Sequence, residues 1–162
     1  MTAAREVEPF RIQAEPGRLL AAVNRLPSLM FRLRLGRLFG ERLAEIVHRG
    51  RKTGLPRTVI VELCDGSVAS GRLVYVAAYG GNAQWIKNLR ASAPVSIQVG
   101  GATFDSPRCE FLDPDATRQA VAAYWRRYPK VAAFLAKRKL YPYPGQPLAD
   151  DPGAPVGLVI HL

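Results

Sequence analysis

Cysteine and histidine are scarce in this sequence. Its 162 residues contain two cysteines, Cys64 and Cys109, and two histidines, His48 and His161. Two cysteines far apart in the chain are typical of small buried thiols in a reducing cytosol, although they also permit one disulfide. So few histidines exclude a histidine-rich metal site, and no cluster of metal-ligating residues appears elsewhere in the sequence. We therefore expect no metal.

Long apolar runs and acidic residues are lacking as well. No apolar stretch approaches the roughly 20 residues that span a bilayer, and the polar opening segment is unlike a secretory leader, so we expect a cytoplasmic protein. The 13 acidic residues are outnumbered by 23 Lys and Arg, which gives a net charge of +10. This excess predicts an anionic partner: nucleic acid, an acidic membrane surface or a polyanionic small molecule. Because no nucleic-acid-binding signature is present, nucleic acid is not expected.

Standard catalytic motifs are also missing. There is no nucleophile elbow, no GxGxxG after a predicted strand and no Gly-Lys-Ser/Thr of a P-loop. The acidic residues are scattered, mostly at turns and helix caps, which argues against a paired-carboxylate mechanism. If the protein is an enzyme, a bound organic cofactor carries the difficult chemistry.

What the sequence does contain is a series of short apolar segments separated by glycine and proline turns. The patterns predict strands at 43–48, 57–63, 73–78, 94–99, 103–112 and 156–162. They predict helices at 18–26, 83–91, 114–128 and 131–139, the third with Asp113 as its cap and Pro114 at its first position. Hairpins dominate and β-α-β crossovers are absent. We therefore expect a mainly β, α+β fold, in which residues 1–162 form a single domain and a small antiparallel barrel carries helices on its outside.

We expect residues 1 to about 40 to form a helical lead-in to this barrel. Within it, residues 29–39 mix large apolar side chains with arginines, and both a helix and a short strand fit the pattern. A helix packed on the core with its arginines in water is the favoured interpretation. Peripheral contact with an anionic surface, at the inner face of a membrane, is the alternative.

A basic turn at residues 50–57 separates the first two predicted strands. Arg51, Lys52 and Arg57 surround glycines and a proline that favour a tight turn. Such a turn concentrates backbone N–H groups and positive charge, which suits a phosphate. A solvated hairpin tip explains the same residues equally well, so both interpretations are open on spacing alone.

Residues 79–90 form a second candidate site, which follows the third predicted strand. Glycines at the strand end would let a flat ring approach the backbone, and the following helix start favours anions. In this interpretation Trp85 lines a ring pocket and Asn88 orients polar groups. The alternative is that Trp85 is a core aromatic residue.

Taken in order, these motifs resemble the deazaflavin-dependent nitroreductase family. The matching segments are 50–58 (GRKTGLPRT), 76–81 (VAAYGG), 85–91 (WIKNLRA) and 94–101 (PVSIQVGG). The similarity covers roughly residues 48–134. It implies a split β-barrel of the FMN-binding type that binds the deazaflavin coenzyme F420. It also implies that the reduced coenzyme passes a hydride to a quinone, a nitro compound or an unsaturated ring.

The resemblance further implies roles for individual residues. Arg51, Lys52 and Arg57 would hold the coenzyme's phosphate and nearby tail, within a turn that also includes Thr53, Gly54 and Pro56. Thr58 and Val59 would lie along the cofactor. Val76, Ala77, Ala78, Tyr79, Gly80 and Trp85 would border the deazaflavin ring, with Asn88 nearby, and Tyr79 and Tyr128 would face the substrate. The net charge of +10 agrees with a coenzyme tail that carries a phosphodiester and several glutamates.

Two positions differ from the best-known nitroreductase of that family. Val131 and Phe134 stand where that enzyme has tyrosines, so Tyr124, Tyr128, Tyr141 or water would have to supply a proton. We expect a small-molecule acceptor, and a protein that is a monomer or a homodimer. Two other functions stay open: the same barrel with FMN as its cofactor, and a non-enzymatic basic domain on an anionic membrane surface.

Overall fold

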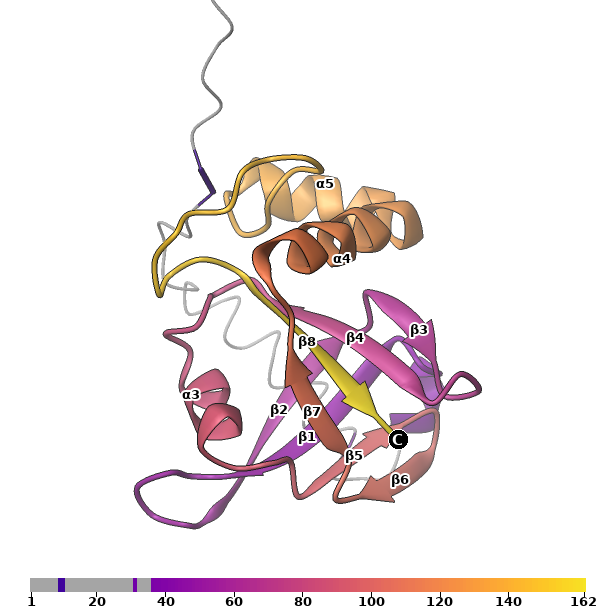
Figure 1. Ribbon diagram of the computed structural model, residues 1–162. Coiled ribbons are helices and arrows are strands. Elements are labelled where there is room, and N and C mark those ends of the chain that lie inside the picture. Colours follow the sequence, from indigo (N-terminus) through magenta and orange to yellow (C-terminus); the bar gives the residue numbers. More distant parts are fainter. Residues whose placement is uncertain (1–8, 11–30, 32–35) are drawn as a thin grey trace, which may run out of the picture.

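Two antiparallel four-stranded sheets form the frame of the protein, whose computed structural model describes residues 9, 10, 31 and 36–162 (Figure 1). The first sheet has the order β2-β1-β5-β6 and comprises β1 (Leu43–Arg49), β2 (Pro56–Glu62), β5 (Ser96–Val99) and β6 (Ala102–Asp105). The second has the order β3-β4-β8-β7 and comprises β3 (Asp65–Ser67), β4 (Arg72–Ala77), β7 (Arg108–Phe111) and β8 (Val156–His161).

The inner faces of the two sheets meet in one hydrophobic core. On β1, Ala44, Ile46 and His48 are buried and the residues between them are partly exposed. This period-two burial is typical of a strand with one face on a core. The opposing sheet contributes its own fully buried side chains, among them Leu73, Tyr75, Leu158 and Ile160.

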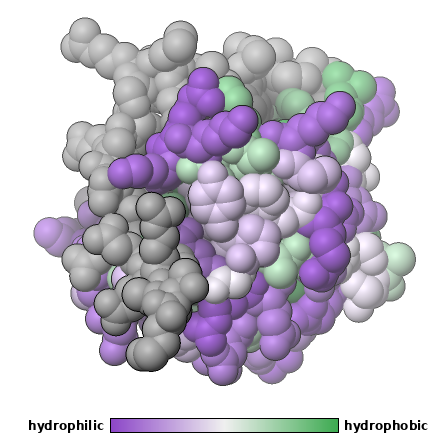
Figure 2. Space-filling model, turned by 90° about the horizontal axis from the view of Figure 1, so that it is seen from above, coloured by the Kyte–Doolittle hydropathy of each residue, from purple (hydrophilic) through white to green (hydrophobic). Residues whose placement is uncertain are grey.

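In the part of the chain that the structure describes, three α-helices lie on the outside of the barrel. Helix α3 (Gln84–Ala91) packs beside β1 and inserts Ile86 and Leu89 into the core. Helices α4 (Pro114–Arg127) and α5 (Pro129–Lys137) lie together over the second sheet (Figure 1). Seen from above, the end of the molecule that carries α4 and α5 presents many hydrophilic side chains, with smaller apolar patches between them (Figure 2).

The split β-barrel and the α+β class are confirmed, and so are most of the predicted elements. Helix α4 begins as expected: the Asp113 carboxylate accepts a hydrogen bond of 2.7 Å from the Ala116 N–H, and Pro114 follows at the first helical position. In the described part of the chain, no helix has the length and hydropathy needed to cross a bilayer.

The prediction of one strand over 103–112 is wrong, because the chain changes sheets within it. Ser106 adopts a positive φ of 49°, and Pro107 follows it without an N–H to donate. Strand β6 therefore pairs with β5, while β7 pairs with β8 in the other sheet. A further short strand that was not predicted, β3, pairs with β4.

The N-terminal predictions fall largely on residues that the structure does not describe. The expected helix at 18–26 lies outside the described residues, as does most of segment 29–39. Of that segment, Gly36–Phe39 form a 3₁₀ helix, and the rings of Phe31 and Phe39 stack with centroids 6.0 Å apart.

Candidate functional site

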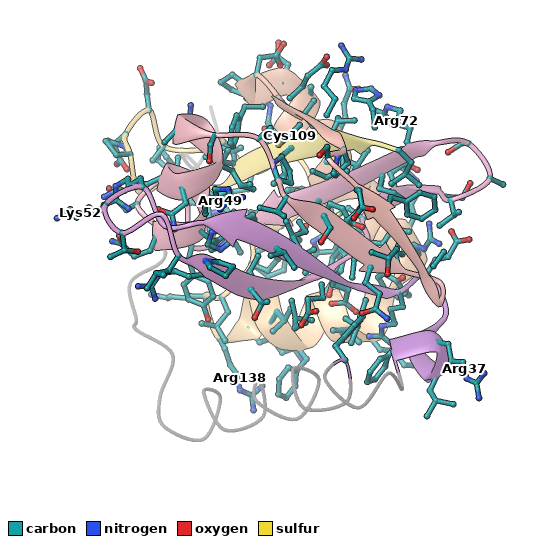
Figure 3. All side chains as sticks on the ribbon, turned by 90° about the horizontal axis from the view of Figure 1, so that it is seen from below. Arg37, Arg49, Lys52, Arg72, Cys109 and Arg138 are labelled. Atoms are coloured by element: carbon teal, nitrogen blue, oxygen red, sulfur yellow. The ribbon has the colours of Figure 1, made fainter. Side chains whose placement is uncertain are left out.

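The basic turn connects β1 to β2 and is closed by its own backbone. The Gly50 N–H donates to the Leu55 carbonyl over 2.9 Å, and the Gly54 N–H donates to the Gly50 carbonyl over 2.7 Å. Gly54 has a φ of 68°, a conformation that glycine adopts without strain. Lys52 lies at the outer end of this turn (Figure 3).

A cavity of about 300 Å³ lies between the turn and helix α3. Its lining comprises Gly50, Arg51, Lys52, Thr53, Arg57, Gln84 and Asn88. A Cβ atom at Gly50 would lie 2.8 Å from Thr53 Oγ1 and 3.1 Å from Arg57 Nε, so the absence of a side chain there lets these groups converge. The three cations predicted to hold a phosphate therefore line one cavity.

Helix α3 fixes one of these cations through two amide side chains. Arg51 Nη1 donates to Gln84 Oε1 over 2.9 Å and to Asn88 Oδ1 over 3.1 Å. The Arg51 backbone N–H also donates to Asn88 Oδ1, again over 3.1 Å. The turn is thus attached to the barrel by specific hydrogen bonds, which a free hairpin tip would lack.

His48 lies behind this arrangement, with 2% of its surface exposed, and its Nδ1 is 3.2 Å from Asn88 Nδ2. Burial lowers the pKa of His48; the positive charge of Arg57 lowers it further, whereas a hydrogen bond with the Arg49 backbone acts in the opposite direction. Neither His48 nor Gln84 was among the predicted site residues. His48 could have been found from its register, since it pairs with Arg57 across β1 and β2.

The predicted ring-binding residues of β4 divide between two faces of the strand. Ala77 is buried in the barrel core. Val76 and Ala78, the residue after the strand, pack outward against a second apolar cluster, which includes residues of α4 and α5. On β2, Val59 packs against the core, while Thr58 is exposed. Trp85 is partly buried and packs against the barrel core.

The segment after β4 is tightly packed at one glycine. Gly80 has a φ of 71°, and a Cβ atom there would clash with the carbonyl groups of Gly153 and Ala154. The neighbouring Tyr79 is 36% exposed, and partial burial raises its pKa. Beyond this segment, on the Lys87 and Arg90 side of α3, is a second cavity of about 670 Å³.

A cluster of tyrosines lies at the opposite end of β2 from the basic turn. The Tyr124 hydroxyl donates to Glu62 Oε2 over 2.6 Å, and Arg42 Nε donates to Glu62 Oε1 over 2.6 Å. The Arg42 guanidinium also lies 4.6 Å from the centre of the Tyr128 ring. Burial raises the pKa of Tyr124 well above its ordinary value, and its hydrogen bond to Glu62 raises it further.

The remaining residues near this cluster are less polar. Tyr141 packs against Tyr124 with ring centroids 4.7 Å apart, and its hydroxyl lies 3.9 Å from the sulfur of Cys64. Burial raises the pKa of Cys64 to about 12, which keeps it a neutral thiol. Val131 packs against the cluster, whereas Phe134 is 50% exposed beneath the guanidinium of Arg138.

Among the described residues, no group of three or more His, Cys, Asp or Glu side chains is arranged to hold a metal ion.

Comparisons with known proteins agree with this architecture. A protein-family model described as F420H(2)-dependent quinone reductase matches residues 34–139. The solved structure of an F420-H2 dependent reductase (FDR-A) is 21% identical, covers 74% of this chain and 95% of its own, and has a TM-score of 0.51. A structure described as a domain-swapped dimer is 20% identical, covers 85% of this chain and 98% of its own, and has a TM-score of 0.53. At these identities the two structures establish a shared fold. No curated protein matches the chain.

Proposed function

The chain belongs to the F420H(2)-dependent quinone reductase family, and from this membership we propose that the basic turn holds the phosphate of coenzyme F420 while the acceptor binds near the tyrosine cluster. As a member of this family the chain is an F420-dependent oxidoreductase. The family match therefore favours the deazaflavin over FMN as its cofactor. The observation that carries the phosphate assignment is the convergence of Arg51, Lys52 and Arg57 on one cavity.

The groups that line the turn cavity fit a phosphodiester. They supply cationic donors from three side chains, a hydroxyl from Thr53 and a floor at Gly50 without a side chain. Hydrogen bonds from charged donors to phosphate are among the strongest in proteins. Arg51 is held in place by Asn88 and Gln84, so less side-chain freedom is lost when an anion binds beside it.

Strand β2 links the phosphate end of the proposed site to the acceptor end. The part of β2 between Arg57 and Glu62 is about 17 Å long in an extended conformation. Thr58 is exposed on β2 next to Arg57. Strand β4 contacts β2, and Val76 and Ala78 pack against residues of α4 and α5. We infer that these residues border the deazaflavin ring, which, when bound in its reduced form, supplies a hydride.

A quinone that receives a hydride also needs a proton to become a hydroquinone. We infer that the hydroxyl of Tyr128 supplies it and regains a proton from water. The half-buried ring of Tyr128 is fixed on one side by Arg42, 4.6 Å from its centre, and on the other by the ring of Tyr124, 5.2 Å away. Tyr79, which is 36% exposed at the end of β4, is the second candidate.

A quinone suits the acceptor side better than a polar nitro compound does. Val131 and Phe134 offer apolar surface at positions where the family's best-known nitroreductase has tyrosines. Apolar side chains favour a flat apolar ring through burial and stacking, whereas they provide no donor for a nitro group.

Two measurements on the purified protein test this proposal. Titration with coenzyme F420, followed by quenching of its fluorescence, should give a dissociation constant in the micromolar range or tighter. Absence of binding would overturn the proposed function. The reduced coenzyme should then be oxidised by a soluble quinone such as menadione faster than by a nitroimidazole, and the reverse order would overturn the acceptor assignment.

A further inference from the structure

The orientation of the Asn88 side chain is determined by Arg51. Both the backbone N–H and Nη1 of Arg51 point at the same atom of Asn88, each over 3.1 Å. Because both are donors, that atom must be the carbonyl oxygen Oδ1. The amide nitrogen Nδ2 therefore faces the other way, toward His48 Nδ1 at 3.2 Å.

This orientation requires a neutral His48. An amide nitrogen can only donate, so Nδ1 of His48 must accept and the ring proton must sit on Nε2. Both residues are almost completely buried, His48 with 2% and Asn88 with 3% of their surfaces exposed. Water therefore has little access to replace the contact if it is lost.

A proton on Nδ1 would place two donors against each other at this contact. The amide would have to turn or withdraw, and either movement removes Oδ1 from Arg51. Among the described residues, the charged side chains at the contacts of His48 and Asn88 are cationic: Arg57 pairs with His48 across β1 and β2, and Arg51 donates to Asn88. Helix α3 contributes the uncharged Asn88 and Gln84 to these contacts. Strand β5, which pairs with β1, has no charged residue over 96–99.

We propose that His48 is a positioning residue: its neutral ring holds Asn88, and through Asn88 it keeps Arg51 and the basic turn in the form that binds the coenzyme's phosphate. This inference rests on the function proposed above, and it adds a dependence on pH. Coenzyme affinity is highest when His48 is neutral and falls when it is protonated. Because burial lowers the pKa of His48, the loss occurs below its ordinary value of about 6.5.

The variant His48→Gln separates this effect from other titrations. Glutamine offers an oxygen that can accept from Asn88 Nδ2, but it does not titrate. The affinity of His48→Gln at about pH 7.5 is taken as that variant's own reference value. As the pH falls toward about 5, wild-type affinity should decrease about tenfold more than that of His48→Gln, the loss of roughly one charge-assisted bond. Both proteins see the same ionisation of the ligand, so the ratio of their dissociation constants isolates His48.

His161 provides a matched control, because it is the second histidine and lies 3.5 Å from Glu110 on the other sheet. His161→Gln should keep the wild-type pH dependence. A ratio of wild-type to His48→Gln dissociation constants that stays flat across this pH range would overturn the inference while leaving the proposed function intact. Absence of coenzyme binding to the wild type at every pH would instead overturn the proposed function and this inference together.

Nuclear magnetic resonance of the His48 ring gives a readout that does not depend on turnover. Long-range proton–nitrogen spectra of the free protein should show an unprotonated Nδ1 at neutral pH. If protonation weakens coenzyme binding, then binding must lower the pKa of His48 by the corresponding factor, because linkage is reciprocal. An Nδ1 that carries the proton in the neutral ring, or a His48 pKa unchanged by saturating coenzyme, would overturn the inference.

Discussion

Tyr124 donates a hydrogen bond of 2.6 Å to Glu62 and so connects helix α4 to the end of strand β2. The second oxygen of the same carboxylate accepts from Arg42, which precedes β1. One carboxylate therefore joins a helix and two strand ends. It also fixes the surroundings of Tyr128, whose ring contacts both Arg42 and Tyr124.

Replacing Tyr124 with phenylalanine should destabilise the protein without changing the shape of its core. Tyr124 is 2% exposed, and its hydroxyl bonds to a charged acceptor, so we expect the free energy of unfolding to fall by about 1.5–3 kcal/mol in Tyr124→Phe. Urea denaturation measures this change. Tyr143→Phe is the control: that side chain is 48% exposed, and its loss should change stability by less than about 0.5 kcal/mol. Equal effects of the two substitutions would contradict a structural role for the Tyr124–Glu62 bond.

The cations of the basic turn should account for much of the coenzyme affinity. Lys52 and Arg57 both line the turn cavity, and each charge-assisted bond to a phosphate is worth about 1.5–3 kcal/mol. We expect the double variant Lys52→Ala/Arg57→Ala to bind coenzyme F420 at least 100-fold more weakly by fluorescence titration, which corresponds to about 3 kcal/mol or more.

Lys87→Ala serves as the matched control for the turn cations. Lys87 lies on the same helix as Asn88, yet it lines the second cavity and not the one at the turn. Its loss should leave the affinity within a factor of about three, the change expected when a distant surface charge is screened by salt. If Lys87→Ala weakens binding as much as the double variant does, the coenzyme's phosphate does not lie at the turn.

Much of this architecture follows from local patterns in the sequence. The alternating residues of β1 and the Asp113–Pro114 start of α4 are properties of a few neighbouring residues, so both can be predicted from the sequence. The change of sheet between β6 and β7 depends on the positive φ of Ser106 and on Pro107, which lie in a polar stretch, 105–108, between the apolar residues of the two strands. The prediction of a single strand there failed because Ser106 and Pro107 break the strand, and the apolar residues on either side of them belong to different sheets.

The candidate site shows the same distinction. The turn with Arg51, Lys52 and Arg57 is contiguous in the sequence and is predicted from it, whereas its connection to Gln84 and Asn88 depends on how α3 packs beside β1. Likewise, Glu62 is one of several scattered acidic residues, and only the fold brings it to Arg42 and Tyr124. Contacts between distant segments carry no local pattern, so propensity and periodicity do not identify them.

Gly80 should tolerate no side chain. An alanine there would combine a positive φ of 71° with a clash against the carbonyl groups of residues 153 and 154. We expect Gly80→Ala to lower the free energy of unfolding by more than about 3 kcal/mol. Gly71→Ala separates the two causes, because Gly71 has a similar φ of 66° and a Cβ atom added to it would meet no other atom within 4 Å. The free energy of unfolding of Gly71→Ala should fall by only about 1–2 kcal/mol, the cost of the left-handed conformation. Similar losses in the two variants would mean that the contact with residues 153 and 154 does not constrain Gly80.

Tyr128→Phe should slow turnover without weakening coenzyme binding. In the proposed function the Tyr128 hydroxyl supplies the proton that accompanies hydride transfer, and loss of a general acid typically reduces the rate roughly 100-fold or more. Tyr128 contacts Arg42 and Tyr124 and does not line the turn cavity, so the dissociation constant of F420 should be unchanged. Steady-state oxidation of the reduced coenzyme by menadione measures kcat, and fluorescence titration measures binding in the same samples. Tyr79→Phe tests the second candidate in the same way. If kcat falls in Tyr79→Phe and not in Tyr128→Phe, the acceptor binds beside the end of β4 and the proton comes from Tyr79. If neither variant loses activity, neither tyrosine supplies an essential proton.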